Sequence, residues 1–368
     1  MVKKNKQATI TDVAQAAGVS TATVSRLMNK AGPISPETER RVLEAISTLN
    51  YKRQRRRSLN GATPGTTSGT ATSKRPLAFL WLGKFATNLQ HSMTNAVIMG
   101  LDRAAREVGR TLNVEHVTEL EKTAVRDVIG DAEGAIIRIA YESVMIGQAV
   151  KWIDGVPAVL VLGGNGEGRT LIDHVTPDNI EVGILAADYL AEKGCRHVVF
   201  ASTSPSSSHT AERCLSFVRD AKFRDLPVNV VFHGEGKLCG RLLNELDTLG
   251  VAWQMAESRL EMVHRIANIE NGAFGLFMPR DLELALLMPQ LQVLGVDFHK
   301  ASVAIGCDNE TRFLQELEPV PASINLHVEH VALRAIRRLN YRLAHPNEPR
   351  TRVTVMPDIV LPTIRNNP

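Results

Sequence analysis

The chain has 368 residues, of which 44% are hydrophobic and 22% charged, a composition that excludes a disordered or fibrous protein. Its four cysteines stand far apart without a C-x-x-C pair, which argues against a disulfide framework and a zinc site. The N-terminal MVKKNKQATI lacks the apolar region of a signal peptide, and no run of about 18 apolar residues is present to cross a bilayer. We therefore expect a cytoplasmic protein that needs no cofactor or metal and does not enter a membrane.

The net charge of +4 is unevenly distributed along the chain. Residues 1–60 carry 12 Lys and Arg against 4 Asp and Glu, whereas residues 61–368 carry 31 against 35. The first segment therefore has a net charge of +8 and the remainder −4. A basic segment joined to a mildly acidic body predicts that the first segment meets a polyanion.

Three short helices are predicted in the basic segment. Thr9 and Ser20 can cap the first two through their hydroxyl groups, and Gly18 between them suits the left-handed residue that ends a helix. Ser35 can cap the third helix, with Pro36 at its first position. Two short helices joined by a Gly-containing turn form a helix-turn-helix, whose second helix enters the major groove of DNA. A small helical bundle that binds protein has the same spacing, but the charge of +8 favours DNA.

The stretch Thr9–Tyr51 resembles the DNA-binding domain of lactose-repressor-type (LacI/GalR) transcriptional regulators nearly position by position, through T-I-T-D-V-A-Q-A-A-G-V-S-T-A-T-V-S-R-L-M-N, I-S-P-E-T-E-R-R-V and L-N-Y. The resemblance implies that Thr21, Ala22 and Arg26 read bases. Arginine can donate a bidentate pair to guanine, and side-chain methyl groups can meet the methyl group of thymine. Contacts to phosphate, which position the head without specifying sequence, are expected from Ser20, Thr23, Ser25 and Asn29.

The segment after this stretch departs from the family pattern. The family's Pro-Asn after L-N-Y is absent, and five of the six residues 52–57 are basic. We expect this run either to form a hinge helix against phosphates, with Leu59 as a minor-groove wedge, or to remain a disordered basic tether. Residues 1–59 are then the DNA-binding domain with its basic hinge, and the Gly/Ser/Thr-rich residues 60–75 are a flexible linker. Further phosphate contacts are expected from Lys52, Arg53, Arg55 and Arg56.

From residue 76 to 368, short apolar runs alternate with amphipathic stretches, which predicts parallel sheets covered by helices on both faces. The expected strands lie at 77–82, 134–140, 156–163, 197–202, 228–232, 275–278 and 301–306. So many strands favour two doubly wound subdomains over one sheet. We expect the first to comprise about 76–174 and 309–330, and the second about 175–308 and 331–368.

This core resembles, more weakly than the head, the effector-binding core of the same family, which is similar to periplasmic sugar-binding proteins. The match is carried by residues 175–200, by R-C-L-S-F at Arg213 and by A-I-G-C-D-N-E at Asp308. The resemblance implies that Arg213 and Asp308 face the cleft, where a guanidinium and a carboxylate suit the hydroxyl groups of a sugar. Weaker candidates for effector contacts are Asn88, His91 and Asp281.

Departures within the core leave two interpretations of its role. Ser216 and Asn309 replace a family Gly and Asp, and S-I-N-L-H at 323–327 replaces a segment that usually carries glutamine or arginine. The core then either binds a small effector or only dimerises, as in an architectural or constitutive regulator. The glycine cluster at 163–168 lacks G-x-G-x-x-G spacing and the serine run at 202–209 lacks G-x-S-x-G, so we expect no enzyme.

Taken as a whole, the sequence predicts an all-α helix-turn-helix head on a periplasmic-binding-protein-like α/β core of two doubly wound parallel-sheet subdomains. The function we expect is that of a homodimeric transcriptional repressor on a near-palindromic DNA operator. A small ligand, a sugar or sugar derivative, would change its operator affinity by closing the core.

Overall fold

The computed structural model of the chain describes residues 10–20, 23–24, 38, 40–42, 44–45, 75–82, 92–117, 122–139, 151, 153, 155–163, 172–205, 207–234 and 240–362. Contacts divide the chain into two units, a head within Met1–Ala71 and a core within Thr72–Pro368. None of the helices among the described residues combines the length and apolar character that a membrane span requires.

A small apolar cluster holds the head together. Helix α1 (Ile10–Ala17) turns its buried side chains toward residues from the second and third predicted helices. The buried residues of α1 are three and four positions apart, which places them on one face of the helix. The cluster consists of Val13, Ala14, Ala17, Val24, Val42 and Ala45.

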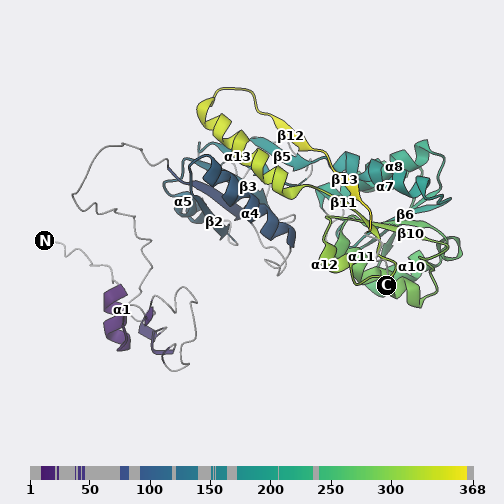
Figure 1. Cartoon of the computed structure of the whole chain (residues 1–368), viewed down its shortest axis with the longest axis horizontal. Helices are drawn as coiled ribbons and strands as arrows, with labels where there is room; N and C mark the ends of the chain where they lie inside the picture. Colours follow the sequence, from purple (N-terminus) through teal and green to yellow (C-terminus); the bar gives the residue numbers. More distant parts are fainter. Residues whose placement is uncertain are drawn as a thin grey trace, which may run out of the picture. The chain divides into compact units, whose positions relative to one another are not determined.

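The core has two sheets, which define a first and a second lobe. The first sheet is parallel throughout and consists, in spatial order, of β12 (Arg352–Val355), β5 (Asp173–Pro177), β4 (Ala158–Val161), β3 (Gly134–Ile139), β1 (Leu77–Leu82) and β2 (Leu112–Val117). Helices α4 (Ser92–Glu107) and α13 (Val328–Ala344) pack on each other over one face, as Figure 1 shows. Helix α5 (Lys122–Ile129) covers the other face.

The second sheet consists, in spatial order, of β13 (Asp358–Val360), β11 (Ala322–Asn325), β10 (Val303–Cys307), β9 (Gly275–Phe277), β6 (Val198–Ser202), β7 (Val228–His233) and β8 (Ala252–Ala256). Only β13 in this sheet pairs antiparallel. One face is covered by α7 (Asn179–Glu192), α8 (Ser208–Phe223) and α9 (Gly240–Thr248). The other is covered by α10 (Arg259–Ala267), α11 (Asp281–Val293) and α12 (Thr311–Leu314). Two doubly wound lobes are therefore confirmed.

All seven predicted strands are present, because each is a short apolar run buried on both faces. The strands that the sequence did not predict have a different character. β2 (LNVEHV) is an edge strand with several exposed residues, and β5 (DHVTP) is buried although it is mostly polar. A continuous apolar run, the signal used to predict the other strands, is absent both from the exposed edge strand β2 and from the buried polar strand β5.

The predicted assignment of segments to subdomains is wrong for the C-terminal part of the chain. Residues 309–325 belong to the second lobe, because β11 pairs with β10. Helix α13 and β12 belong to the first lobe, and the chain then returns to the second lobe at β13. The chain thus crosses between the lobes three times, after β5, after β11 and after β12. The apolar stripe of α13 suits either sheet, so its partner is chosen only by tertiary packing.

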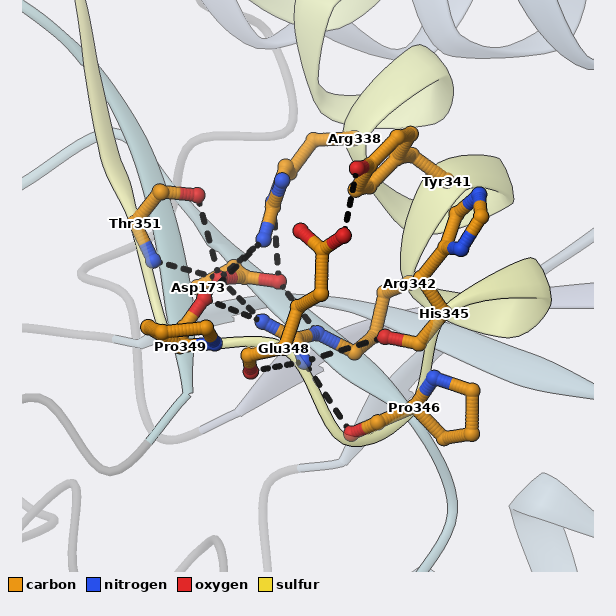
Figure 2. A network of polar contacts seen from close by, with 9 residues as sticks. All are labelled: Asp173, Arg338, Tyr341, Arg342, His345, Pro346, Glu348, Pro349 and Thr351. Atoms are coloured by element: carbon orange, nitrogen blue, oxygen red, sulfur yellow. Dashed lines mark hydrogen bonds and ion pairs between the residues drawn. The ribbon is translucent and has the colours of Figure 1, made fainter.

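Asp173, the first residue of β5, ties together the segments that return to the first lobe. Its carboxylate accepts hydrogen bonds from Arg342 Nε at 2.8 Å, from Arg338 Nη2 at 3.1 Å and from the Thr351 backbone N–H at 2.7 Å (Figure 2). Burial alone would raise the pKa of Asp173, but these hydrogen bonds outweigh it and lower the pKa to about 2. The network therefore joins α13, the loop before β12 and β5 around one buried charge.

Candidate functional site

The turn after α1 has the geometry that a helix-turn-helix requires. Gly18 has φ of +63°, in the left-handed region that favours glycine, and its N–H donates to the Gln15 carbonyl oxygen at 3.3 Å. Ser20 Oγ then accepts the Thr23 N–H at 3.1 Å, and the Ser20 carbonyl oxygen accepts the Val24 N–H at 3.2 Å. The predictions that Gly18 ends the first helix and that Ser20 caps the second are confirmed.

Only part of the predicted DNA-contacting set lies in the described residues. Ser20 is exposed and Thr23 is half-buried, and their hydroxyl oxygens lie 2.9 Å apart. Outside the described residues lie Thr21, Ala22, Ser25, Arg26, Asn29, Lys52, Arg53, Arg55, Arg56 and Leu59.

In the core, Arg213 projects from α8, whose first turn is capped by Ser207 from the serine run. Ser207 lies in the loop that joins β6 to α8. The Arg213 side chain is 4% exposed and lies near one helix residue and two loop residues. Its Nε donates to Asn179 Oδ1 at 3.0 Å, and its Nη1 donates to the Pro279 carbonyl oxygen at 2.7 Å. The same Nη1 lies 3.9 Å from Asp308 Oδ1.

Asp308 follows directly on β10, at the carboxyl end of the strand. This edge of an open parallel sheet is where ligands of α/β proteins bind. The Asp308 side chain is 3% exposed, and its Oδ1 has no hydrogen-bond partner among the described residues. Burial raises the pKa of Asp308 to about 7, although Arg213 and Arg280 act in the opposite direction.

Asp281 holds the loop that carries Asp308. The Asp281 carboxylate accepts the Ser323 hydroxyl at 2.8 and 2.9 Å and the Glu310 backbone N–H at 2.7 Å. Gly306 leaves room for this contact, because a Cβ there would collide with Asp281 Oδ1. Asp281 is fully buried, with a pKa raised well above its ordinary value by burial and by the Asp308 charge. Asp281 therefore fixes the position of the loop that carries Asp308.

The charge of one residue of the first lobe, Arg138, acts on a side chain of the second lobe. Arg138, near the end of β3, places its guanidinium carbon 5.3 Å from the centroid of the Trp81 ring. Its charge reaches His209 in the first turn of α8. Burial holds the pKa of His209 well below its ordinary value, and Arg213, Arg280 and Arg138 add to this effect. The His209 ring is therefore neutral at physiological pH, with Nε2 3.2 Å from Ser207 Oγ.

The structure brings Arg213 and Asp308 together and places Asp281 behind them. Asn88 and His91 lie outside the described residues. Sequence reasoning missed Asn179, which orients Arg213 and also donates to Glu212 Oε2 at 3.3 Å. A signal was present in the sequence, because Asn179 follows the capping Asp178 within residues 175–200, which carry part of the resemblance to the family.

The divergent S-I-N-L-H segment forms the second crossing between the lobes. Leu326 is buried, and Asn325 Oδ1 accepts the His327 N–H at 3.0 Å. His327 has φ of +49° and its Nε2 lies 3.0 Å from Asp358 Oδ1, on the strand after the third crossing. These side chains therefore have structural partners where the family usually carries glutamine or arginine.

A helix-turn-helix head joined to two doubly wound lobes defines a DNA-binding transcriptional regulator. Residues 9–54 match the family described as bacterial regulatory proteins, lacI family. The HTH-type transcriptional repressor PurR of Vibrio parahaemolyticus is 24% identical over 358 residues, which cover 96% of this chain and 97% of that protein. The sucrose operon repressor of Streptococcus mutans is 24% identical over 347 residues, covering 93% and 95%.

Solved structures agree with this assignment at the level of the fold. A transcriptional regulator CelR–cellobiose complex has a TM-score of 0.62 at 19% identity and covers 96% of this chain and 98% of its own. A lac repressor dimer bound to operator and the anti-inducer ONPF has a TM-score of 0.59 at 18% identity and covers 97% and 98%. The chain is thus similar to LacI-type regulators in the sequence of its head and in the fold of its core.

Proposed function

We propose that the chain represses transcription in the cytoplasm as a homodimer on a near-palindromic operator, and that a small polar ligand changes its operator affinity. A sugar or sugar derivative held by Arg213 and Asp308 is the ligand class that we favour. Asp281 acts in this proposal by positioning the Asp308 loop. The observation that carries the proposal is the buried Arg213–Asp308 pair at the carboxyl end of β10, in a chain with a LacI-type head.

Support for operator binding comes from the head. The Gly18 turn and the Ser20 cap begin a second helix, and Thr21 and Ala22 follow Ser20 directly in the sequence. In a helix-turn-helix, the N-terminal residues of this helix contact base edges in the major groove. The charge of +8 in residues 1–60 supplies the phosphate attraction that does not depend on sequence.

Arg26→Ala should weaken operator binding by about 1–3 kcal/mol and relax the sequence preference, because a bidentate contact to a base edge is lost. Fluorescence anisotropy measures both effects, by comparing binding to DNA from upstream of the protein's own gene with binding to a scrambled duplex. Lys52→Ala is the matched control, because loss of a phosphate contact should weaken both duplexes about equally. Unchanged discrimination in Arg26→Ala would show that this side chain does not read bases.

Support for ligand binding comes from the energetically unfavourable surroundings of the Asp308 carboxylate. A buried carboxylate oxygen without a hydrogen-bond donor is unfavourable, and strongly shifted pKa values concentrate at functional sites. The Arg213 guanidinium and the Asp308 carboxylate present donors and acceptors at one place, as a polyol requires.

Asp308→Asn should abolish ligand binding and at the same time stabilise the ligand-free protein at pH 7. The pKa of Asp308 is about 7 in the folded protein and 3.8 ordinarily, so the unfolded chain loses this proton first as the pH rises. The wild-type protein therefore loses stability from this group between about pH 4 and pH 7, whereas asparagine does not titrate. We expect the free energy of unfolding of the variant to be higher near pH 7 by an amount on the order of 2 kcal/mol. The gain is limited because the substitution also removes the negative charge beside Arg213.

Urea unfolding of both proteins at pH 4.5 and pH 7.5 measures this difference. The gain should be larger at pH 7.5. A variant that is less stable than the wild type at pH 7.5 would mean that Asp308 has a structural and not a binding role.

Thermal-shift assays with sucrose, cellobiose, glucose and gluconate test the ligand class. A ligand at about 100 times its Kd stabilises by roughly 2.7 kcal/mol, and this gain should vanish in Asp308→Asn. If none of the four stabilises the protein while operator binding is intact, the core is that of a regulator that only dimerises.

A further inference from the structure

One hydrogen bond joins the Asp308 loop of the second lobe to a helix of the first. Glu310 Oε1 accepts the backbone N–H of Met93, in the first turn of α4, at 3.3 Å. The two residues are 217 positions apart in the chain. The Glu310 side chain is 5% exposed, so this carboxylate is buried at the contact between the lobes.

The first turn of a helix is the place where a carboxylate from outside stabilises most. Its backbone N–H groups have no partner within the helix, and the helix dipole gives this end a partial positive charge. A Glu310 carboxylate supplied by the other lobe therefore serves as a cap that exists only while the lobes are in contact.

The loop that carries Glu310 is held at each of three successive residues. The backbone N–H of Asp308 donates to the Ile324 carbonyl oxygen at 2.9 Å, and that of Asn309 donates to Ser323 Oγ at 3.0 Å. The N–H of Glu310 donates to Asp281. Asp308 and Asn309 have φ of +106° and +51°, so the turn is left-handed at both residues. Asp308 and Glu310 therefore lie two residues apart on one tightly held turn.

Helix α4, which receives this hydrogen bond, is itself packed firmly within the first lobe. It packs so closely on α13 that a Cβ at Gly100 would lie 2.9 Å from the Ala332 Cβ. Arg103 Nη2 of α4 also donates to Glu329 Oε2 of α13 at 2.9 Å. Helix α13 in turn carries Arg338 and Arg342, which bind Asp173 (Figure 2).

We propose that Glu310 is a cross-lobe latch, a positioning residue whose carboxylate caps α4 and so couples the Asp308 loop to the placement of the first lobe. The coupling to a ligand rests on the proposed function of Asp308, whereas the latch itself does not. Glu310 lies close enough to Asp308 for its charge to contribute to the raised pKa of that carboxyl group.

Hydrogen exchange followed by mass spectrometry on the full-length, ligand-free protein tests the latch. Glu310→Ala should speed exchange in the first turn of α4 by roughly five- to tenfold, while exchange in α13 and in the second sheet stays as in the wild type. Glu310→Gln keeps an acceptor oxygen and should restore most of the protection. Both variants keep the backbone N–H that Asp281 accepts. Glu316→Ala, which removes an exposed acidic side chain from the same segment, is the matched control and should have no effect.

Two results would overturn the latch. In the first, Glu310→Ala leaves exchange in α4 unchanged. In the second, exchange rises equally throughout the core, which would mean that Glu310 contributes only to general stability.

The sugar that stabilises the wild type in the thermal-shift assay then tests the coupling. It should slow exchange in the first turn of α4 in the wild type and Glu310→Gln, but not in Glu310→Ala. If no sugar of the panel binds, the proposed ligand class fails, whereas the ligand-free exchange result still decides the latch.

Discussion

Asp173→Asn should lower the free energy of unfolding by about 3–5 kcal/mol, because it leaves the charges of Arg338 and Arg342 without the carboxylate that they surround. Asparagine has nearly the same shape, so the loss comes from charge and hydrogen bonding and not from a cavity. The Asp173 side chain has no exposed surface, and those of the two arginines are only 12% and 10% exposed. We expect the melting temperature of the core to fall by roughly 10 °C.

The pH dependence of this effect has a definite sign. The folded pKa of Asp173 is about 2 against an ordinary 3.8, so its contribution is complete above about pH 4 and is lost as the pH falls toward 2. The difference between wild type and variant should therefore shrink over that interval. Asp188→Asn is the control, because Asp188 pairs with Arg224 at 2.8 Å at a partly exposed site, where such pairs contribute about 0–1 kcal/mol. A loss in Asp173→Asn no larger than in this control would contradict the assignment.

Gly183→Ala should destabilise the core by about 2–3 kcal/mol, although alanine is normally the better helix former. Gly183 lies in α7 where that helix approaches α8. A Cβ at this position would collide with the Ser216 hydroxyl oxygen and the Arg213 carbonyl oxygen, and would lie 2.6 Å from the Phe217 nitrogen. Two of these three atoms belong to the backbone, so α7 and α8 must separate.

The same substitution should weaken binding at the candidate site, because α8 carries Arg213. Urea unfolding and the thermal-shift assay measure the two effects. The double variant Gly183→Ala, Ser216→Gly should regain only part of the stability, since removing the hydroxyl group leaves both backbone contacts. Wild-type stability in Gly183→Ala would show that the helices tolerate a wider separation.

The close approach of these helices also explains a departure from the family pattern. Ser216 stands where the family motif has glycine, and its hydroxyl group donates to the Glu212 carbonyl oxygen of its own helix at 2.9 Å. The small residue needed at the contact is supplied by Gly183 on the facing helix. The altered motif therefore leaves the packing beneath Arg213 intact.

Features with a local cause were predictable from the sequence. The Gly18 turn and the Ser20 cap follow from backbone freedom and a hydroxyl group at the right spacing. The seven predicted strands follow from uninterrupted apolar runs. Arg213 and Asp308 were predicted from the resemblance of their motifs to those of the family, and the structure brings their side chains to within 3.9 Å of each other.

Only the tertiary structure decided which distant segments became partners. Arg342 and Asp173 are 169 positions apart, and Glu310 and Met93 are 217 apart, so no periodicity links the members of either pair. The polar strand β5 is buried because two arginines of α13 neutralise its first residue, and α13 joins the first lobe because it packs on α4. Local sequence determines whether an element is a helix or a strand and where it begins and ends. Which apolar face or charged group becomes its partner depends on the segments that the tertiary fold places next to it.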